Sequence, residues 1–204
     1  MTAQFLGVRG TYISCPDMPN HIRIRNESCM VDTRRIMKLK FLIDEDFVNY
    51  KKPSMVVGFP FCSMKCNIDC GKEVCHNTPL SEEPIIDMAV DHICERYLTN
   101  PITSAIVMQG FEPLDSSFEL IELIDALRNK NGCMDDIVIF TGYTEEECNG
   151  EYDKVYENVN FEKIHAVYKQ LQQYENIIVK FGRYIPGDEP HPDELLGVSL
   201  ASDN

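Results

Sequence analysis

The sequence predicts an α/β protein in which a mostly parallel sheet forms an open, partial (β/α) barrel. Short apolar runs that suit buried strands alternate with segments whose apolar residues recur at helical spacing. Roughly four or five such strand–helix units follow Met37, too few for the usual closed eightfold barrel of ~250 residues. In open sheets of this kind, functional residues gather at the carboxyl ends of the strands.

Apolar runs define the expected strands. A short strand is expected at 38–43, followed by an acidic turn. Continuous apolar runs, which are typical of strands buried on both faces, predict further strands at 54–59, 105–108, 137–140 and 177–179.

Helical spacing of apolar residues predicts the first two connecting helices. One is expected after Ser81, with apolar positions at 86, 89, 90, 93 and 97. Ser116 and Glu119 have the spacing of a capping box, which predicts the start of a second helix. Asn131 and Gly132 predict its end.

Two more helices are expected in the second half of the chain. Thr144 and Glu147 again have capping-box spacing and predict a short helix. Asn160 is expected to open a longer one that buries Ile164, Val167 and Leu171. The segment beyond Pro186 is rich in Pro and Asp, apart from the short run at 195–198.

Charge and hydropathy exclude several classes of protein. The net charge of −14 disfavours general nucleic-acid binding, because an acidic surface repels phosphate backbones. No run approaches ~18 consecutive apolar residues, and no secretory signal is apparent, so we expect a cytoplasmic protein without a membrane span. Residues 1–36 hold five arginines against three acidic residues, which sets them apart from the acidic remainder. We therefore predict an appendage at 1–36 and a compact domain at 37–204.

Four of the nine cysteines fall within 14 residues: Cys62, Cys66, Cys70 and Cys75. Thiolates grouped in one loop are the ligands that an iron–sulfur cluster or zinc requires, and a disulfide framework is not expected in a cytoplasmic protein. Three thiolates on a four-iron cluster leave one iron open to a substrate. Four thiolates would close the site, as in an electron carrier or a structural zinc site.

Two parts of this loop resemble the radical S-adenosylmethionine superfamily. Cys62-x3-Cys66 matches the first half of the superfamily's Cys-x3-Cys-x2-Cys pattern, and Val74-Cys75-His76-Asn77 matches its end. Among these proteins the chain most resembles the activating enzymes of glycyl-radical enzymes, such as that of anaerobic ribonucleotide reductase. The resemblance implies a partial barrel of the radical S-adenosylmethionine type.

The loop departs from this pattern by an insertion, because eight residues rather than two separate Cys66 from Cys75. The resemblance makes Cys62, Cys66 and Cys75 the expected cluster ligands, since the residues around Cys75 match those of the final cysteine. Cys70 is the alternative third ligand.

A second motif follows the second buried strand. Gly110-Phe111-Glu112-Pro113 resembles the superfamily's Gly-Gly-Glu-Pro segment, with Phe111 in place of the second glycine. The resemblance implies that Gly110 and Glu112 receive the amino group of S-adenosylmethionine, and that Val74 and Asn77 also belong to the cofactor site. Lys180 and Arg183 are candidates for contact with its carboxylate or ribose.

The function implied by this resemblance is an anaerobic iron–sulfur oxidoreductase. Such an enzyme holds a 4Fe-4S cluster, cleaves S-adenosylmethionine reductively to a 5′-deoxyadenosyl radical, and installs a glycyl radical on a partner such as anaerobic ribonucleotide reductase. A flavodoxin or a ferredoxin-type protein would donate the electron. The alternatives are a radical enzyme acting on another peptide or a small metabolite, and a non-catalytic zinc-binding interaction module.

Overall fold

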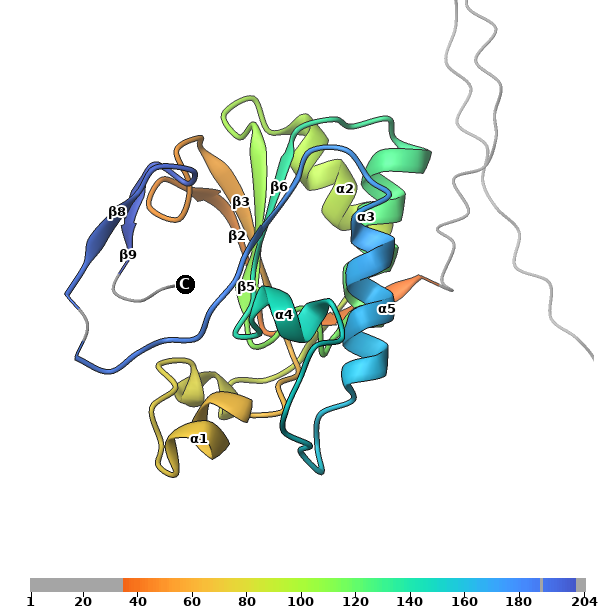
Figure 1. The fold of residues 1–204 in the computed structure, drawn as a ribbon. Helices are drawn as coiled ribbons and strands as arrows, with labels where there is room; N and C mark the ends of the chain where they lie inside the picture. The colour runs from red at the N-terminus through yellow and green to blue at the C-terminus, as the bar shows by residue number, and fades with distance from the viewer. Residues whose placement is uncertain (1–34, 188, 201–204) are drawn as a thin grey trace, which may run out of the picture. The chain divides into compact units, whose positions relative to one another are not determined.

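The computed structural model describes residues 35–187 and 189–200, whose centre is a five-stranded sheet (Figure 1). Four strands run parallel, and the first strand of the sheet is antiparallel to its neighbour. In spatial order the strands are β2 (Phe41–Asp46), β3 (Ser54–Phe59), β5 (Ala105–Gly110), β6 (Asp136–Phe140) and β7 (Ile177–Lys180). The α/β class and the mostly parallel sheet are confirmed, and the radical S-adenosylmethionine type of barrel stays a prediction.

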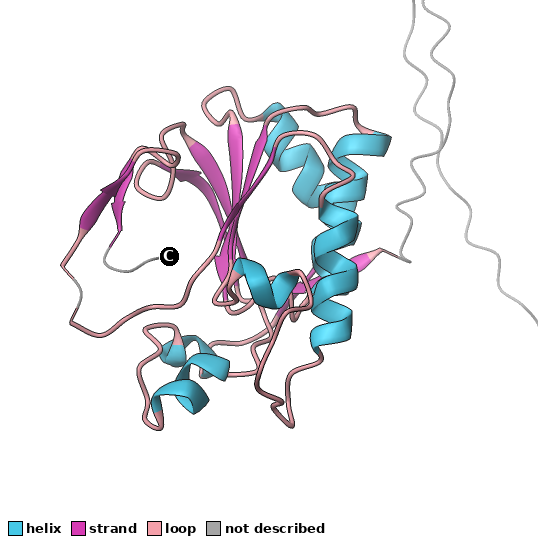
Figure 2. Ribbon diagram, viewed as in Figure 1, coloured by secondary structure: helices cyan, strands magenta, loops and turns pink. Residues whose placement is uncertain are grey.

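The larger helices cover one face of this sheet (Figures 1 and 2). They are α2 (Val90–Thr99), α3 (Ser117–Asp125) with its π-helical continuation η2 (Ala126–Lys130), and α5 (Phe161–Leu171). Their apolar sides and the facing strand residues form the main core, in which Leu120, Ile139 and many others are fully buried. Burial of this apolar surface is the main source of stability for the sheet.

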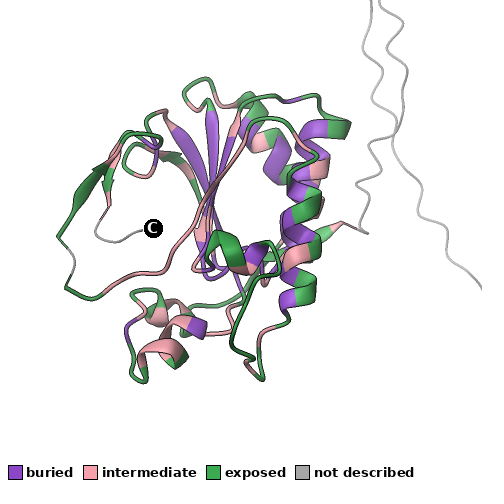
Figure 3. Ribbon diagram, in the orientation of Figure 1, coloured by how far each residue is buried: buried purple, intermediate pink, exposed green. Residues whose placement is uncertain are grey.

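The opposite face of the sheet carries a smaller core of Tyr50, Val56, Ala105, Val107, Val138 and Leu196. A hairpin of β8 (His191–Asp193) and β9 (Val198–Leu200) contributes to it, and the Lys51 N–H donates to the Leu196 carbonyl at 2.7 Å. The strands between the two cores are the most deeply buried part of the fold (Figure 3). No element was predicted beyond Pro186, so the hairpin was not foreseen from the sequence.

The remaining elements are short. A separate two-stranded ladder pairs β1 (Ile36–Leu39) with β4 (Ile86–Ala89). Two helices follow the first buried strand, α1 (Lys65–Cys70) and the 3-10 turn η1 (Thr78–Ser81), and α4 (Glu145–Cys148) follows β6. Residues 1–34 of the predicted appendage lie outside the described residues, and Ile36 at its end begins β1. No helix among the described residues has the length and apolar character needed to cross a membrane.

The strand predictions at 54–59, 105–108, 137–140 and 177–179 are confirmed, and two neighbouring expectations were wrong. The run 38–43 is divided at Lys40 between β1 and β2, which belong to different sheets. The apolar residues after Ser81 do not form one helix, because residues 86–89 pair with β1 as a strand and the helix begins at Val90. The strand could not be recognised from the sequence, because the spacing of Ile86, Ala89 and Val90 also suits a helix.

The two predicted capping boxes have different outcomes. Thr144 is extended, and its side chain accepts from the Glu147 N–H while the Glu147 carboxylate accepts from the Thr144 N–H, so this box is confirmed. Ser116 precedes α3 with φ −92° and ψ 43° and makes no side-chain cap. An N-cap side chain reaches the first turn from the extended region, which Ser116 does not occupy. The Asn160 cap on α5 is confirmed, since its side chain accepts from the Lys163 N–H.

Candidate functional site

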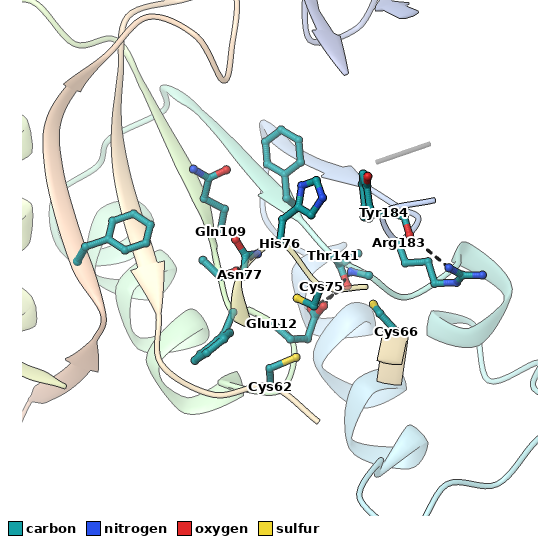
Figure 4. Close-up of a pocket in the computed structure, with 15 residues that line it drawn as sticks. Cys62, Cys66, Cys75, His76, Asn77, Gln109, Glu112, Thr141, Arg183 and Tyr184 are labelled. Atoms are coloured by element: carbon teal, nitrogen blue, oxygen red, sulfur yellow. Dashed lines mark hydrogen bonds between the residues drawn. The ribbon is translucent and has the colours of Figure 1, made fainter. Parts of the chain in front are cut away.

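A cavity of about 320 Å³ lies at the carboxyl ends of the parallel strands (Figure 4). Its walls come from the loop after β3, from the ends of β5 and β6, and from the segment after β7. The lining residues named below are Cys62, Cys66, Cys75, His76, Asn77, Gln109, Gly110, Phe111, Glu112, Thr141, Gly142, Arg183 and Tyr184. Parallel sheets concentrate functional groups at this edge, as the sequence predicted.

Three of the four clustered cysteines line this cavity: Cys62, Cys66 and Cys75, called here the cavity cysteines. Figure 4 shows their side chains around one space beside Glu112. Cys70 does not line the cavity, and its sulfur accepts a hydrogen bond from Nη1 of Arg183 at 3.1 Å. The structure thus brings together the three cysteines that the sequence favoured and directs the fourth elsewhere.

Burial controls the ionisation of two cavity cysteines. Removal from water raises the pKa of the Cys62 thiol, and it raises that of Cys66 to about 11, with a further contribution from the nearby Cys75. Thiols with such pKa values are protonated at neutral pH. A bound metal reverses this preference, because a coordinating thiol is deprotonated outright.

The donor set fits an iron–sulfur cluster by its chemistry. Three soft sulfur donors share one half-buried cavity, which suits iron–sulfur ligation and leaves the rest of the wall to other groups. Within the described part of the chain, no three His, Cys, Asp or Glu side chains form a group that could hold a single metal ion. The cavity cysteines instead lie around one shared space beside Glu112, an arrangement that suits a cluster of several irons.

The Glu112 carboxylate joins the ends of β5 and β6. Its Oε1 accepts from the Thr141 hydroxyl at 2.7 Å and from the Leu114 N–H at 3.1 Å, and its Oε2 accepts from the Gly142 N–H at 2.8 Å. The side chain is buried, and burial together with the charge of Asp115 raises its pKa to about 8 despite these hydrogen bonds. Glu112 is therefore fixed in place before any ligand arrives.

Position 110 requires glycine, because the backbone conformation and the close approach of the neighbouring strand leave no room for a side chain. Its φ is 94°, and an added Cβ would lie 2.9 Å from the Phe59 nitrogen. Phe111 needs no such freedom, because Met64 and Asn176 are the non-glycine residues with positive φ in the described part of the chain. Its ring fills part of the cavity wall instead.

The other residues predicted for the cofactor site divide into two groups. Asn77 lines the cavity, and its Nδ2 donates to the Gly110 carbonyl at 2.5 Å. Val74 is buried outside the cavity. Arg183 lines the cavity, whereas Lys180 forms an ion pair with Asp193 at 2.9 Å.

Sequence reasoning missed several lining residues. Gln109 and Thr141 lie next to motifs that were recognised, so their position at strand ends was an available signal. Tyr184 directly follows Arg183, a candidate for the cosubstrate site, so its position was a signal as well. Its ring lies 3.8 Å from that of His76, centroid to centroid, and the two rings close one side of the cavity.

One comparison with known proteins finds a match. The family model described as a 4Fe-4S single cluster domain matches residues 54–181, which run from β3 through β7 and include all four clustered cysteines. No curated protein and no solved structure matches the chain. The match covers most of the chain and contains every residue of the cavity wall except Phe41 in β2 and those after β7.

Proposed function

Because this chain belongs to the 4Fe-4S single cluster domain family, we propose that it is a radical enzyme that cleaves S-adenosylmethionine. The observation that carries the proposal is the cavity itself, in which three cysteines share one wall with a buried carboxylate and an arginine. A bound 4Fe-4S cluster supplies one electron, which breaks the bond between the sulfonium sulfur and C5′ to give methionine and a 5′-deoxyadenosyl radical. The chain's own side chains bind and orient the cosubstrate.

Two groups of the cavity wall suit the amino-acid part of the cosubstrate, and a bound ammonium group would favour the charged form of Glu112. A carboxylate has about four acceptor positions, and Glu112 uses three of them within the chain, which leaves one on Oε2 for an ammonium group. Arg183 also lines the cavity, and its guanidinium suits a carboxylate. His76 and Tyr184 offer ring faces to the adenine.

Cosubstrate cleavage is tested directly after anaerobic reconstitution. The reduced protein should convert S-adenosylmethionine to 5′-deoxyadenosine and methionine, both measured by mass spectrometry. Glu112→Gln keeps the size of the side chain but can never become the carboxylate that an ammonium group favours, so it should weaken cosubstrate binding about tenfold or more while iron content is retained. The exposed Glu73→Gln is the matched control. A colourless protein that holds zinc and no iron would overturn the proposal in favour of an interaction module.

The ligand assignment has its own test. We propose Cys62, Cys66 and Cys75 as ligands, so Cys75→Ala should lose the cluster while Cys70→Ala retains it, as measured by iron and sulfide per chain. The arginine contact of Cys70, outside the cavity, supports this expectation. Retention by Cys75→Ala with loss by Cys70→Ala would reverse the assignment.

The proposed target of the radical is a glycine of a partner enzyme, such as anaerobic ribonucleotide reductase. The radical would take a hydrogen atom from that glycine, leaving 5′-deoxyadenosine and a glycyl radical, with a flavodoxin or ferredoxin-type donor as the electron source. Mixing with the reductase should produce a glycine-centred radical in electron paramagnetic resonance spectra. Cosubstrate cleavage without that radical would redirect the proposal to another peptide or a small metabolite.

A further inference from the structure

The insertion between Cys66 and Cys75 creates a positional problem for the third cavity cysteine. Helix α1 ends at Cys70, and Gly71 then reverses the chain with φ 63°. Most of the insertion is half-buried or exposed, so packing against the sheet does not determine its path. A longer loop also costs more conformational entropy to close. Some other contact must return Cys75 to the cavity.

The Asn67 side chain makes that contact. Its Oδ1 accepts from the Val74 N–H at 2.9 Å and from the Cys75 N–H at 3.1 Å. One carbonyl oxygen has two lone pairs, so both are used by these adjacent amides. Because Asn67 directly follows Cys66, the contact ties the backbone of the third cavity cysteine to the residue beside the second.

Contacts beyond Cys75 hold the other side of the same loop. The Asn77 amide donates to the Gly110 carbonyl, and the Thr78 hydroxyl donates to the Cys75 carbonyl at 2.9 Å. These contacts fix where the loop leaves the cavity. They do not constrain residues 71–74, and the contacts of Asp69 and Cys70 hold only the end of α1, so the return of Val74 and Cys75 depends on Asn67.

We propose that Asn67 is a positioning residue that sets Cys75 as the third cluster ligand across the insertion. The inference rests on the proposed function only in taking Cys75 as a ligand. Asn67 also lies within a helix, where Asn is a poor helix former, so its presence there is not explained by helix stability. Partners that orient metal ligands commonly affect metal retention 10–100-fold, roughly, when they are removed.

The test compares substitutions that keep or remove the acceptor oxygen. Asn67→Leu and Asn67→Ala remove it but favour the helix, whereas Asn67→Asp keeps acceptor oxygens in the same place. The exposed Lys72→Ala is a control for disturbance of the insertion. After anaerobic reconstitution, we would measure iron and sulfide per chain and the rate at which a chelator bleaches the cluster absorbance.

Asn67→Leu and Asn67→Ala should lose the cluster about tenfold faster than the unmodified protein. Asn67→Asp and Lys72→Ala should retain it, and thermal unfolding of the cluster-free proteins should be the same for all variants. Unchanged bleaching in both Asn67→Leu and Asn67→Ala would overturn the inference. Failure of the unmodified protein to cleave S-adenosylmethionine would count against the proposed function and not against this inference. A Cys75→Ala variant that keeps its cluster would overturn this inference, because Cys75 would then not be the third ligand, while cosubstrate cleavage would still be judged by its own assay.

Discussion

The parallel sheet and the cysteine lobe, defined as residues 62–77, are held in place by different forces. All six residues of β3 are buried, and its neighbour β5 is nearly as enclosed. In the cysteine lobe Lys65 and Val74 alone are buried. The sheet is stabilised by apolar burial, which is strong but not directional, whereas the lobe depends on a few directed polar contacts.

The lobe's contacts converge on one buried ammonium group. Lys65 Nζ lies 2.8 Å from Asp69 and 2.8 Å from Glu147, so it joins α1 to the cap of α4. Tyr156 donates to the same Asp69. A region held in this way can open without unfolding the sheet, and metal binding would then contribute much of its order. The contrast between the regions can be tested by substitution.

The largest loss of stability is expected from a substitution in the sheet. Ile139 is fully buried in β6, so Ile139→Ala should lower the free energy of unfolding by about 3 kcal/mol through lost burial and a cavity. Urea unfolding followed by circular dichroism measures this value. Ile68→Ala, at an exposed position of the cysteine lobe, should change it by less than about 0.5 kcal/mol. Equal losses in the two variants would erase the distinction between the regions.

A substitution of Lys65 is expected to have an intermediate effect, confined to the local opening of α1. Burial opposes its charge, yet the hydrogen bonds to Asp69 and Glu147 raise the pKa of Lys65, so it is charged at neutral pH. Lys65→Met removes hydrogen bonds to two carboxylates and should ease opening of α1 by about 2 kcal/mol. Hydrogen exchange should accelerate in residues 65–70 and stay unchanged in β5. Acceleration in both places would mean that the lobe and the sheet open together.

The smallest effect concerns an ion pair at the start of β6. Partial burial opposes the charge of Asp136, but hydrogen bonds from Lys52 at 2.5 Å and Tyr50 at 2.8 Å lower its pKa. A depressed carboxyl pKa contributes stability that is present above the unfolded value of about 3.9 and is lost as pH falls through the folded pKa. Asp136→Asn should therefore lower the free energy of unfolding by under about 1 kcal/mol at pH 7, and it should have no effect once the pH is below the folded pKa of Asp136. Unfolding curves across pH 2–7 would reveal a pH-independent loss if the pair has no such role.

The same contrast explains what could be predicted from sequence. Continuous apolar runs identified β3, β5, β6 and β7, because strands buried on both faces leave a local signature. The β1–β4 ladder pairs residues about 50 positions apart, and no local pattern at Ile86 reports a partner at Leu39. The hairpin after Pro186 was missed for the same reason, since its order comes from packing of Leu196 against Tyr50 and Val56.

Within the candidate site, motifs identified residues but not their contacts. Gly110 and Glu112 were identified by resemblance, and both line the cavity. No local pattern indicated that Glu112 would be held by Thr141 and Gly142, because these lie one strand further along the chain. The role of Asn67 was hidden too, since a single polar residue in an insertion has no pattern to distinguish it.

The contact between Asn67 and the amides of Val74 and Cys75 also makes the tip of the cysteine lobe available to engineering. Asp69 and Cys70 are engaged with Lys65 and Arg183, but Gly71 and Lys72 are exposed, and a Cβ at Gly71 would meet no neighbouring atom. A short peptide epitope or a spectroscopic label can be grafted between Gly71 and Lys72, which would place a reporter a few residues from the cavity cysteines while their geometry is preserved.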